Sequence, residues 1–241
     1  MNIVGCRLNI KDVKFSKFNN IFLKSMVKNQ KKYKINTKLI KYLMNNEELS
    51  GDEIVKIMYP DDNFNIFISH SSKDYSKVIK IAELIKYATS QNGNKGLNSF
   101  VDEDVWGNSY NLLDRLNESA LIDCDEMIYD YDATNLNAAK VFVMLSNALI
   151  TMINKCKYFL FIESEESLNS QNSTTRSPWI YLELNAFHVK HSLGGMITES
   201  KERLAARKIE SANINFQAIV NDLKKISIED FIEIIKYQEK I

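Results

Sequence analysis

The chain has 241 residues, with 31 basic and 31 acidic side chains, 45% hydrophobic and 26% charged residues, a composition typical of a soluble globular protein. Its 7 glycines and 2 prolines exclude collagen-like and low-complexity architectures. We expect a cytoplasmic protein, because no apolar run approaches the roughly 18 residues that cross a bilayer and the N-terminus has no signal-like apolar core.

Cysteine and histidine are sparse in this sequence. The three cysteines are odd in number and widely spaced, which favours reduced thiols over a disulfide framework. The three histidines are too scattered for a convincing ligand cluster. We therefore expect no bound metal.

Residues 1–62 are predicted to form a basic, helical N-terminal extension. Residues 1–45 hold 11 Lys and Arg against a single acid, a balance that could suit nucleic acid or an anionic membrane. The segment lacks the interleaved arginines and aromatic rings of a nucleic-acid surface. We therefore favour docking on the acidic remainder of the chain and expect neither partner. Two short helices are predicted, one from Asn36 and one that opens at Ser50 and ends at Pro60.

Residues 63–241 alternate between strand and helix patterns, which predicts an α/β domain. The β-branched and aromatic run at 64–69 indicates a strand, residues 75–89 have helical apolar spacing, and 97–101 indicate a second strand. This β-α-β unit should have parallel strands. Residues 102–139 form a long, acidic and irregular insertion, and a segment of that length is usually functional or mobile.

The later part of the chain continues the alternation. An almost wholly apolar helix is predicted over 141–153, buried on two sides or at a self-association surface. The continuous apolar run at 158–162 indicates a buried central strand. Ser177 before Pro178 is typical of a helix start, because the serine hydroxyl accepts an orphan N–H and proline has none to leave unpaired. Further expected elements are a helix over 199–210, a strand over 214–220 and a final helix from Ser227.

The helix that starts at Ser177 carries an acid in apolar surroundings. Trp179 and Glu183 are four residues apart and so share a face, with Ala186 and Phe187 one turn further on. Burial penalises the charged form of a carboxyl group. Such an acid is either paired and structural or catalytic, and this pattern alone favours the structural interpretation.

Three segments in order resemble the signatures of Toll/interleukin-1 receptor (TIR) domains. Residues 65–74, NIFISHSSKD, resemble the first strand and the serine-rich loop after it, and residues 99–102, SFVD, look like the second strand. Residues 158–164, followed by SPWIYLEL at 177–184, are similar to the third strand and to the helix whose Trp-x-x-x-Glu carries the acid of the enzymatic members. The likeness covers about residues 64–190, and three motifs in the right order are fairly specific.

The resemblance implies a flavodoxin-like parallel sheet flanked by helices, with ligands bound beyond the carboxyl ends of the strands. Enzymatic TIR domains cleave the nicotinamide–ribose bond of NAD⁺, which would be a substrate here and not a cofactor. Glu183 would be the catalytic acid that stabilises an oxocarbenium-like centre. The implied substrate-binding residues are Ser69, His70, Asp102, Trp106 and Trp179.

The N-terminal extension and the insertion at 102–139 depart from the family pattern. TIR domains assemble largely through the loop after the second strand, so the insertion bears directly on self-association. The apolar helix at 141–153 and the insertion are our candidate interface. The likeness also implies bacterial antiphage defence of the Thoeris kind, in which the nucleotide product signals to a downstream effector.

Three functions are compatible with the sequence. The leading one is NAD⁺ cleavage, by hydrolysis to ADP-ribose or by cyclisation to a cyclic ADP-ribose; the sequence does not separate these two outcomes. The second is a non-catalytic TIR adaptor that acts by self-association, against which the retained Glu183 argues. The third is another N-glycosidase, such as a nucleoside deoxyribosyltransferase, which shares the sheet topology and an acidic nucleophile.

Overall fold

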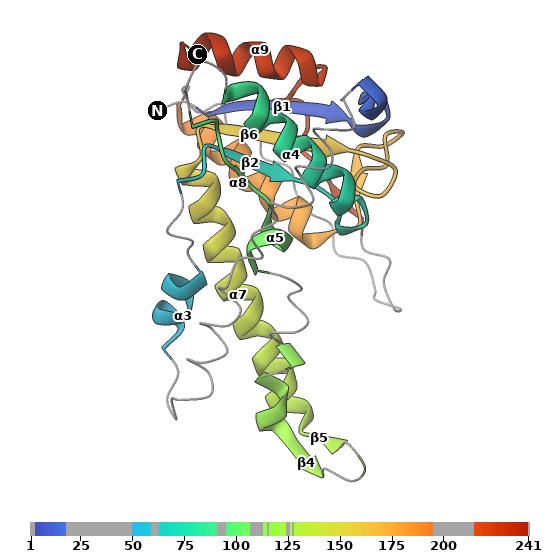
Figure 1. Cartoon of the computed structure of the whole chain (residues 1–241). Coiled ribbons are helices and arrows are strands. Elements are labelled where there is room, and N and C mark those ends of the chain that lie inside the picture. The colour runs from blue at the N-terminus through green and yellow to red at the C-terminus, as the bar shows by residue number, and fades with distance from the viewer. Residues whose placement is uncertain are drawn as a thin grey trace. The chain divides into compact units, whose positions relative to one another are not determined.

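The chain divides into two compact units. The first comprises Met1–Asn29, Phe64–Phe100 and Ile153–Ile241, and the second comprises Gln30–Asn63 and Val101–Met152. The computed structural model (Figure 1) describes residues 3–17, 50–58, 63–90, 95–106, 113–114, 116–123, 126, 128–194 and 215–240.

The first unit contains a five-stranded sheet with every neighbouring pair parallel. Its strands are β1 (Val4–Asn9), β2 (Ile66–Ser69), β3 (Ser99–Phe100), β6 (Tyr158–Glu163) and β9 (Lys224–Lys225), in the spatial order β3-β2-β6-β1-β9. All six residues of the central strand β6 are buried, as its continuous apolar run predicts. The α/β class and the parallel sheet are therefore confirmed, and the sheet is compatible with a flavodoxin-like fold.

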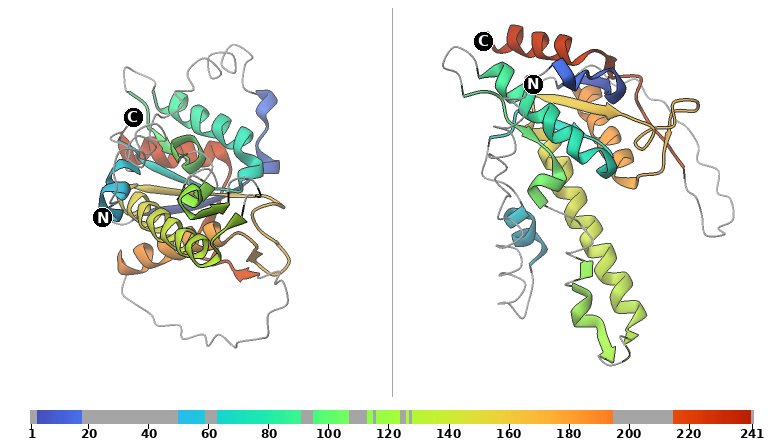
Figure 2. Two further views of the ribbon diagram at one scale, coloured as in Figure 1. Left: turned by 90° about the horizontal axis from the view of Figure 1, so that it is seen from below. Right: turned by 45° about the vertical axis from the view of Figure 1, so that its right-hand side comes forward.

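Helices cover both faces of this sheet (Figures 1 and 2). α4 (Tyr75–Thr89) and α9 (Ile228–Glu239) pack together on one face. α8 (Pro178–Gly194) lies on the other and contacts β1 and β2. The β2-α4-β3 unit confirms the predicted crossover between parallel strands. α9 begins after Ser227, as predicted, with a capping box formed by Ser227 and Asp230.

Aromatic rings fill the space between the sheet and α8. Phe159 stacks between Phe67 and Phe187, with ring centroids 5.6 and 4.7 Å away respectively. Gly5 of β1 lies under the ring of Phe187, because a Cβ added at Gly5 would come within 2.0 Å of that ring. A side chain at position 5 would therefore collide with the buried ring of Phe187.

Residues 4–9 correct the predicted N-terminal extension over 1–62. They form β1, which pairs along its whole length with β6, so they belong to the sheet and not to a separate helical piece. α3 (Gly51–Met58) does begin after Ser50, whose hydroxyl accepts a hydrogen bond from the Glu53 N–H at 3.4 Å. The helix predicted from Asn36 lies outside the described residues.

The second unit includes α5 (Asp102–Trp106), most of α7 (Tyr131–Lys155) and an antiparallel hairpin of β4 (Leu121–Asp123) and β5 (Ile128–Tyr129). The insertion over 102–139 thus contains regular elements, and α7 begins well before the predicted 141–153. Short 3-10 helices occur at Ile10–Asp12, Phe15–Lys17, Ser72–Asp74 and Glu118–Ala120.

Among the described helices, α7 alone is long and apolar enough to cross a membrane. Half of its most apolar window is buried within the structure. The core helix of a soluble protein meets the same criterion, so this is weak evidence for a membrane.

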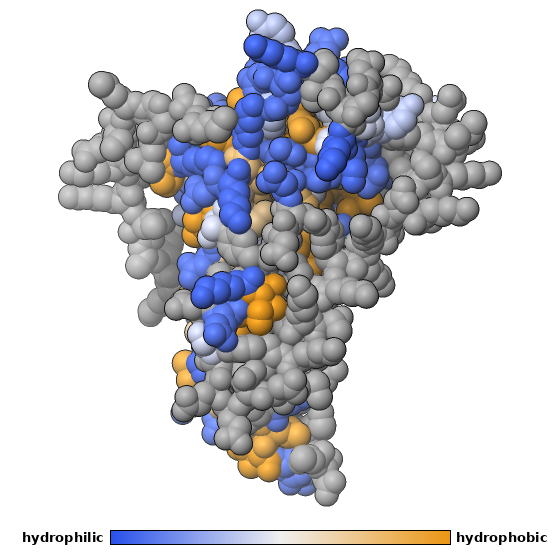
Figure 3. Space-filling view, turned by 60° about the vertical axis from the view of Figure 1, so that its left-hand side comes forward, coloured by the Kyte–Doolittle hydropathy of each residue, from blue (hydrophilic) through white to orange (hydrophobic). Residues whose placement is uncertain are grey.

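The strand predicted over 214–220 is present but shorter. Phe216–Gln217 form β8, which pairs with β7 (Thr174–Thr175) in a small antiparallel ribbon outside the main sheet. The helix predicted over 199–210 lies outside the described residues. On the face drawn in Figure 3, hydrophilic residues dominate the described surface, with hydrophobic ones in small separate groups.

Candidate active site

A buried hydrogen bond joins Ser69, at the carboxyl end of β2, to Glu183 of α8. The Ser69 hydroxyl donates to Glu183 Oε2 at 2.6 Å. Ser69 is fully buried and Glu183 is only 3% exposed. A hydroxyl donor at this distance holds the carboxyl oxygen in one position. The first and last of the three motifs thus meet at one point of the fold.

The N-terminus of α8 sets the position of Glu183. The Ser177 hydroxyl accepts a hydrogen bond from the Ile180 N–H at 3.3 Å and Pro178 is the first helical residue, which confirms the predicted cap. Trp179 lies half-buried one turn before Glu183. The predicted pair therefore shares a helix face at the carboxyl edge of the sheet.

His70 follows Ser69 and is buried, at 8% exposure. Its Nδ1 lies 3.2 Å from the carbonyl oxygen of Ile68. If Nδ1 donates to that carbonyl, it carries the proton in the neutral ring. His70 is thus held against the backbone of its own strand, beside the Ser69–Glu183 pair.

The loops after three neighbouring strands are tied together above the sheet. Ser164, directly after β6, donates to Asp74 Oδ2 at 2.5 Å, which joins it to the loop after β2. Lys73 pairs with Glu166 at 2.6 Å. Lys11, after β1, pairs with Glu165 at 2.5 Å. These contacts gather the carboxyl-edge loops around the end of β6.

Asp102 and Trp106 are the first and last residues of α5. This helix belongs to the second unit. The site built within the first unit therefore comprises four of the six predicted residues, Ser69, His70, Trp179 and Glu183.

The sequence did not single out a second buried acid at the same edge. Glu163, the last residue of β6, is 6% exposed, and its Oε2 lies 3.9 Å from Nη1 of Arg7 on β1. An acid that ends a wholly apolar strand was the available signal for Glu163. Arg7 was not identified as a site residue, because residues 4–9 were not predicted to be a strand of the sheet.

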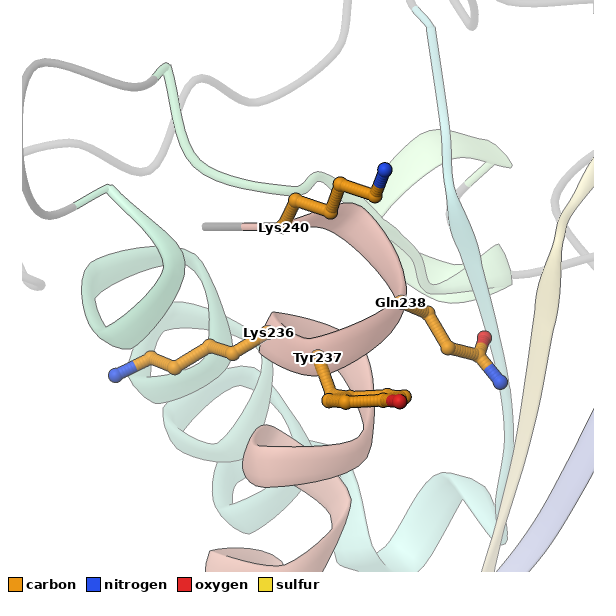
Figure 4. Close-up of a pocket in the computed structure, with 4 residues that line it drawn as sticks. All are labelled: Lys236, Tyr237, Gln238 and Lys240. Carbon is orange, nitrogen blue, oxygen red and sulfur yellow. The ribbon is translucent and has the colours of Figure 1, made fainter.

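A surface pocket lies at the opposite edge of the sheet (Figure 4). It is lined by Lys236, Tyr237, Gln238 and Lys240, all from the end of α9. Glu239, in the same turn, accepts hydrogen bonds from Lys157 at 2.5 Å and from Tyr158 at 2.8 Å, where β6 begins. The pocket therefore lies at the amino end of β6 and is separate from the Ser69–Glu183 site.

Among the residues that the structure describes, no group of three His, Cys, Asp or Glu side chains could hold a metal ion. No family model, no curated protein and no solved structure matches the chain.

What the site can do chemically follows from its burial and charge. Ser69 holds the Glu183 carboxylate in one orientation, in surroundings where its charge acts strongly on neighbouring groups. A carboxylate placed in this way can stabilise positive charge that develops on a sugar ring when a glycosidic bond breaks.

Proposed function

We propose that the chain is a TIR-type enzyme that cleaves the nicotinamide–ribose bond of NAD⁺. One observation carries the proposal: Glu183, the acid of the Trp-x-x-x-Glu motif, is buried and accepts a hydrogen bond from the Ser69 hydroxyl at 2.6 Å. Ser69 belongs to the first TIR-like motif. Two of the three segments that carry the resemblance thus supply the two partners of one buried bond.

The reaction needs little beyond this carboxylate. Nicotinamide is cationic in NAD⁺ and leaves as a neutral base, so the ribose carbon develops positive charge that Glu183 stabilises. In hydrolysis water adds to that carbon, giving ADP-ribose, nicotinamide and one proton. In cyclisation a purine nitrogen of the same molecule adds to that carbon instead, and the cyclic product is lighter than ADP-ribose by one water.

Glu183 is 3% exposed, so a dinucleotide reaches it only when the covering side chains move. We propose that self-association provides this movement. Large exposed apolar side chains along α7 support an association surface; they are Tyr131, Leu136, Phe142 and Val143. The nucleotide product would then act on a downstream effector, as the resemblance implies for antiphage defence.

The test is incubation of the purified protein with NAD⁺ at low and at high protein concentration, with nicotinamide quantified and the second product identified by mass. We expect wild type to release nicotinamide and Glu183→Gln to lose at least about 100-fold in kcat, because the neutral amide cannot stabilise a cation. Glu233→Gln, at an exposed position of α9, is the matched control and should retain full activity.

Equal turnover by Glu183→Gln and wild type would reject the assignment of the acid. No turnover by wild type at any concentration, with association seen by light scattering, would favour the adaptor function. Release of a base from deoxynucleosides but not from NAD⁺ would favour the deoxyribosyltransferase-like function.

A further inference from the structure

The buried acid Glu163 has an oxygen that the protein does not satisfy. Its Oε1 lies 3.4 Å from the Ser170 hydroxyl, whereas Oε2 is buried and accepts no hydrogen bond within the described part of the chain. Leaving a buried charged acceptor unmatched costs free energy. Such a group in a folded protein points to strain, a functional role or a bound water, ion or ligand.

Arg7, on the neighbouring strand, also has a buried polar atom without a hydrogen bond among the described residues. Its Nε–H is buried and has no acceptor among the described residues, although the guanidinium is 3.9 Å from Glu163 Oε2. A well-formed arginine–carboxylate pair is bidentate, with distances of about 2.8 Å. The two groups therefore form a long ion pair without a bidentate hydrogen bond, and the side chain of Arg7 is 28% exposed.

A second cation lies beside Arg7. β1 pairs with β9 so that Arg7 is in register with Lys225, and in-register neighbours project from the same face of a sheet. Lys225 is exposed. Two cations and one carboxylate leave a positive balance, which suits a phosphate, while the carboxylate suits the hydroxyl groups of a ribose.

The strand register places these groups next to the candidate active site. Phe161 of β6 is in register with Ser69 on one side and with Arg7 on the other. Ser69 and Arg7 therefore lie in one row on the α8 face, two strand spacings or about 10 Å apart. A single dinucleotide can span that distance.

We propose that Arg7, Lys225 and Glu163 form the subsite for the adenosine diphosphate half of the substrate, an inference that rests on the proposed NAD⁺ cleavage. Arg7 and Lys225 bind the diphosphate, and Glu163 Oε2 accepts a hydrogen bond from a ribose hydroxyl. The reacting ribose then lies toward Glu183. β1, which the predicted extension had placed outside the domain, thereby supplies a substrate-binding residue.

The experiment uses ADP as the probe, titrated by calorimetry into the full-length protein. We expect wild type to bind ADP, Arg7→Met to bind about tenfold more weakly, and Lys225→Met to lose about threefold because its cation is exposed. Lys224→Met is the matched control, since Lys224 is the adjacent exposed lysine of β9 and projects from the other face. It should bind ADP like wild type.

The subsite is rejected if wild type does not bind ADP, or if Arg7→Met and Lys225→Met bind it as tightly as Lys224→Met. Should Arg7→Met not fold, the comparison of Lys225→Met with Lys224→Met decides. Nicotinamide release is measured separately. If ADP binding depends on Arg7 but the protein releases no nicotinamide, the subsite is supported and NAD⁺ cleavage is rejected. Nicotinamide release without such dependence rejects only the subsite.

Discussion

At the scale of single residues, the Ser69–Glu183 bond is the feature on which catalysis would depend. The hydroxyl fixes one carboxylate oxygen at 2.6 Å inside the protein. A hydrogen bond to a charged group contributes roughly 1.5–3 kcal/mol. Because this hydrogen bond joins two side chains of the protein, removing it should change the orientation of Glu183 more than the affinity for substrate.

We expect Ser69→Ala to lower kcat for NAD⁺ about tenfold or more, with KM little changed. Steady-state nicotinamide release checks this, with Ser76→Ala, an exposed serine of α4, as control. An unchanged kcat together with a lowered melting temperature would instead assign Ser69 a structural role.

The residues that sequence reasoning named and those it missed differ in their local signals. Ser69 and Glu183 lie in segments with clear strand and helix patterns. Arg7 lies in a six-residue strand, VGCRLN, in which the buried Cys6 and Leu8 alternate with Gly5, Arg7 and Asn9, so the only local signal was a short period-2 pattern. Its role depends on neighbours about 150 residues away, which a local pattern cannot reveal.

At the scale of elements, Lys190 of α8 stabilises the end of α7. Its ammonium group donates hydrogen bonds to the carbonyl oxygens of Ile153, Asn154 and Cys156 at 2.9, 2.9 and 2.8 Å. The last carbonyls of a helix have no partner within it, and a cation there also suits the negative end of the helix dipole. This contact fixes the chain just before the central strand β6.

We expect Lys190→Met to destabilise the protein by roughly 1–3 kcal/mol, because it keeps the unbranched apolar part of the side chain and removes the ammonium group that donates all three hydrogen bonds. For a chain of this size the melting temperature should fall by roughly 2–4 °C per kcal/mol. Thermal unfolding followed by circular dichroism measures the change. Lys77→Met, an exposed lysine of α4, should melt like wild type, and an equal effect of both substitutions would contradict the capping role.

At the scale of the whole molecule, the elements predicted from sequence are those with a local cause. α4 has the predicted bounds, and α8 and α9 begin at the predicted serine caps. β9 escaped prediction because it consists of two exposed lysines, which are held in the sheet by pairing with β1 and not by burial. The early start of α7 was not predicted because its first turns are mostly exposed and carry no continuous apolar stripe.

The response of the fold to alkaline pH follows from three buried groups in or beside the sheet. Burial raises the pKa of the Cys6 thiol to about 11 and that of Cys156 to about 12. Burial also raises the pKa of Tyr158, as does its hydrogen bond to Glu239. Each group keeps its proton in the folded state at pH values where the unfolded chain has released it.

This difference in bound protons between the folded and unfolded states determines whether stability rises or falls with pH. Well below the ordinary thiol pKa of 9.0 the thiols are protonated in both states, so they do not make stability depend on pH. Between about 9 and the raised pKa values the unfolded chain binds fewer protons, and each thiol lowers the free energy of unfolding by up to about 1.4 kcal/mol per pH unit. We expect the urea midpoint to be flat from pH 7.5 to 8.5 and to fall from pH 9 to 10.5. Cys156→Ala should reduce that slope whatever its effect on stability at neutral pH, and an identical slope in the variant would show that the thiol of Cys156 does not contribute.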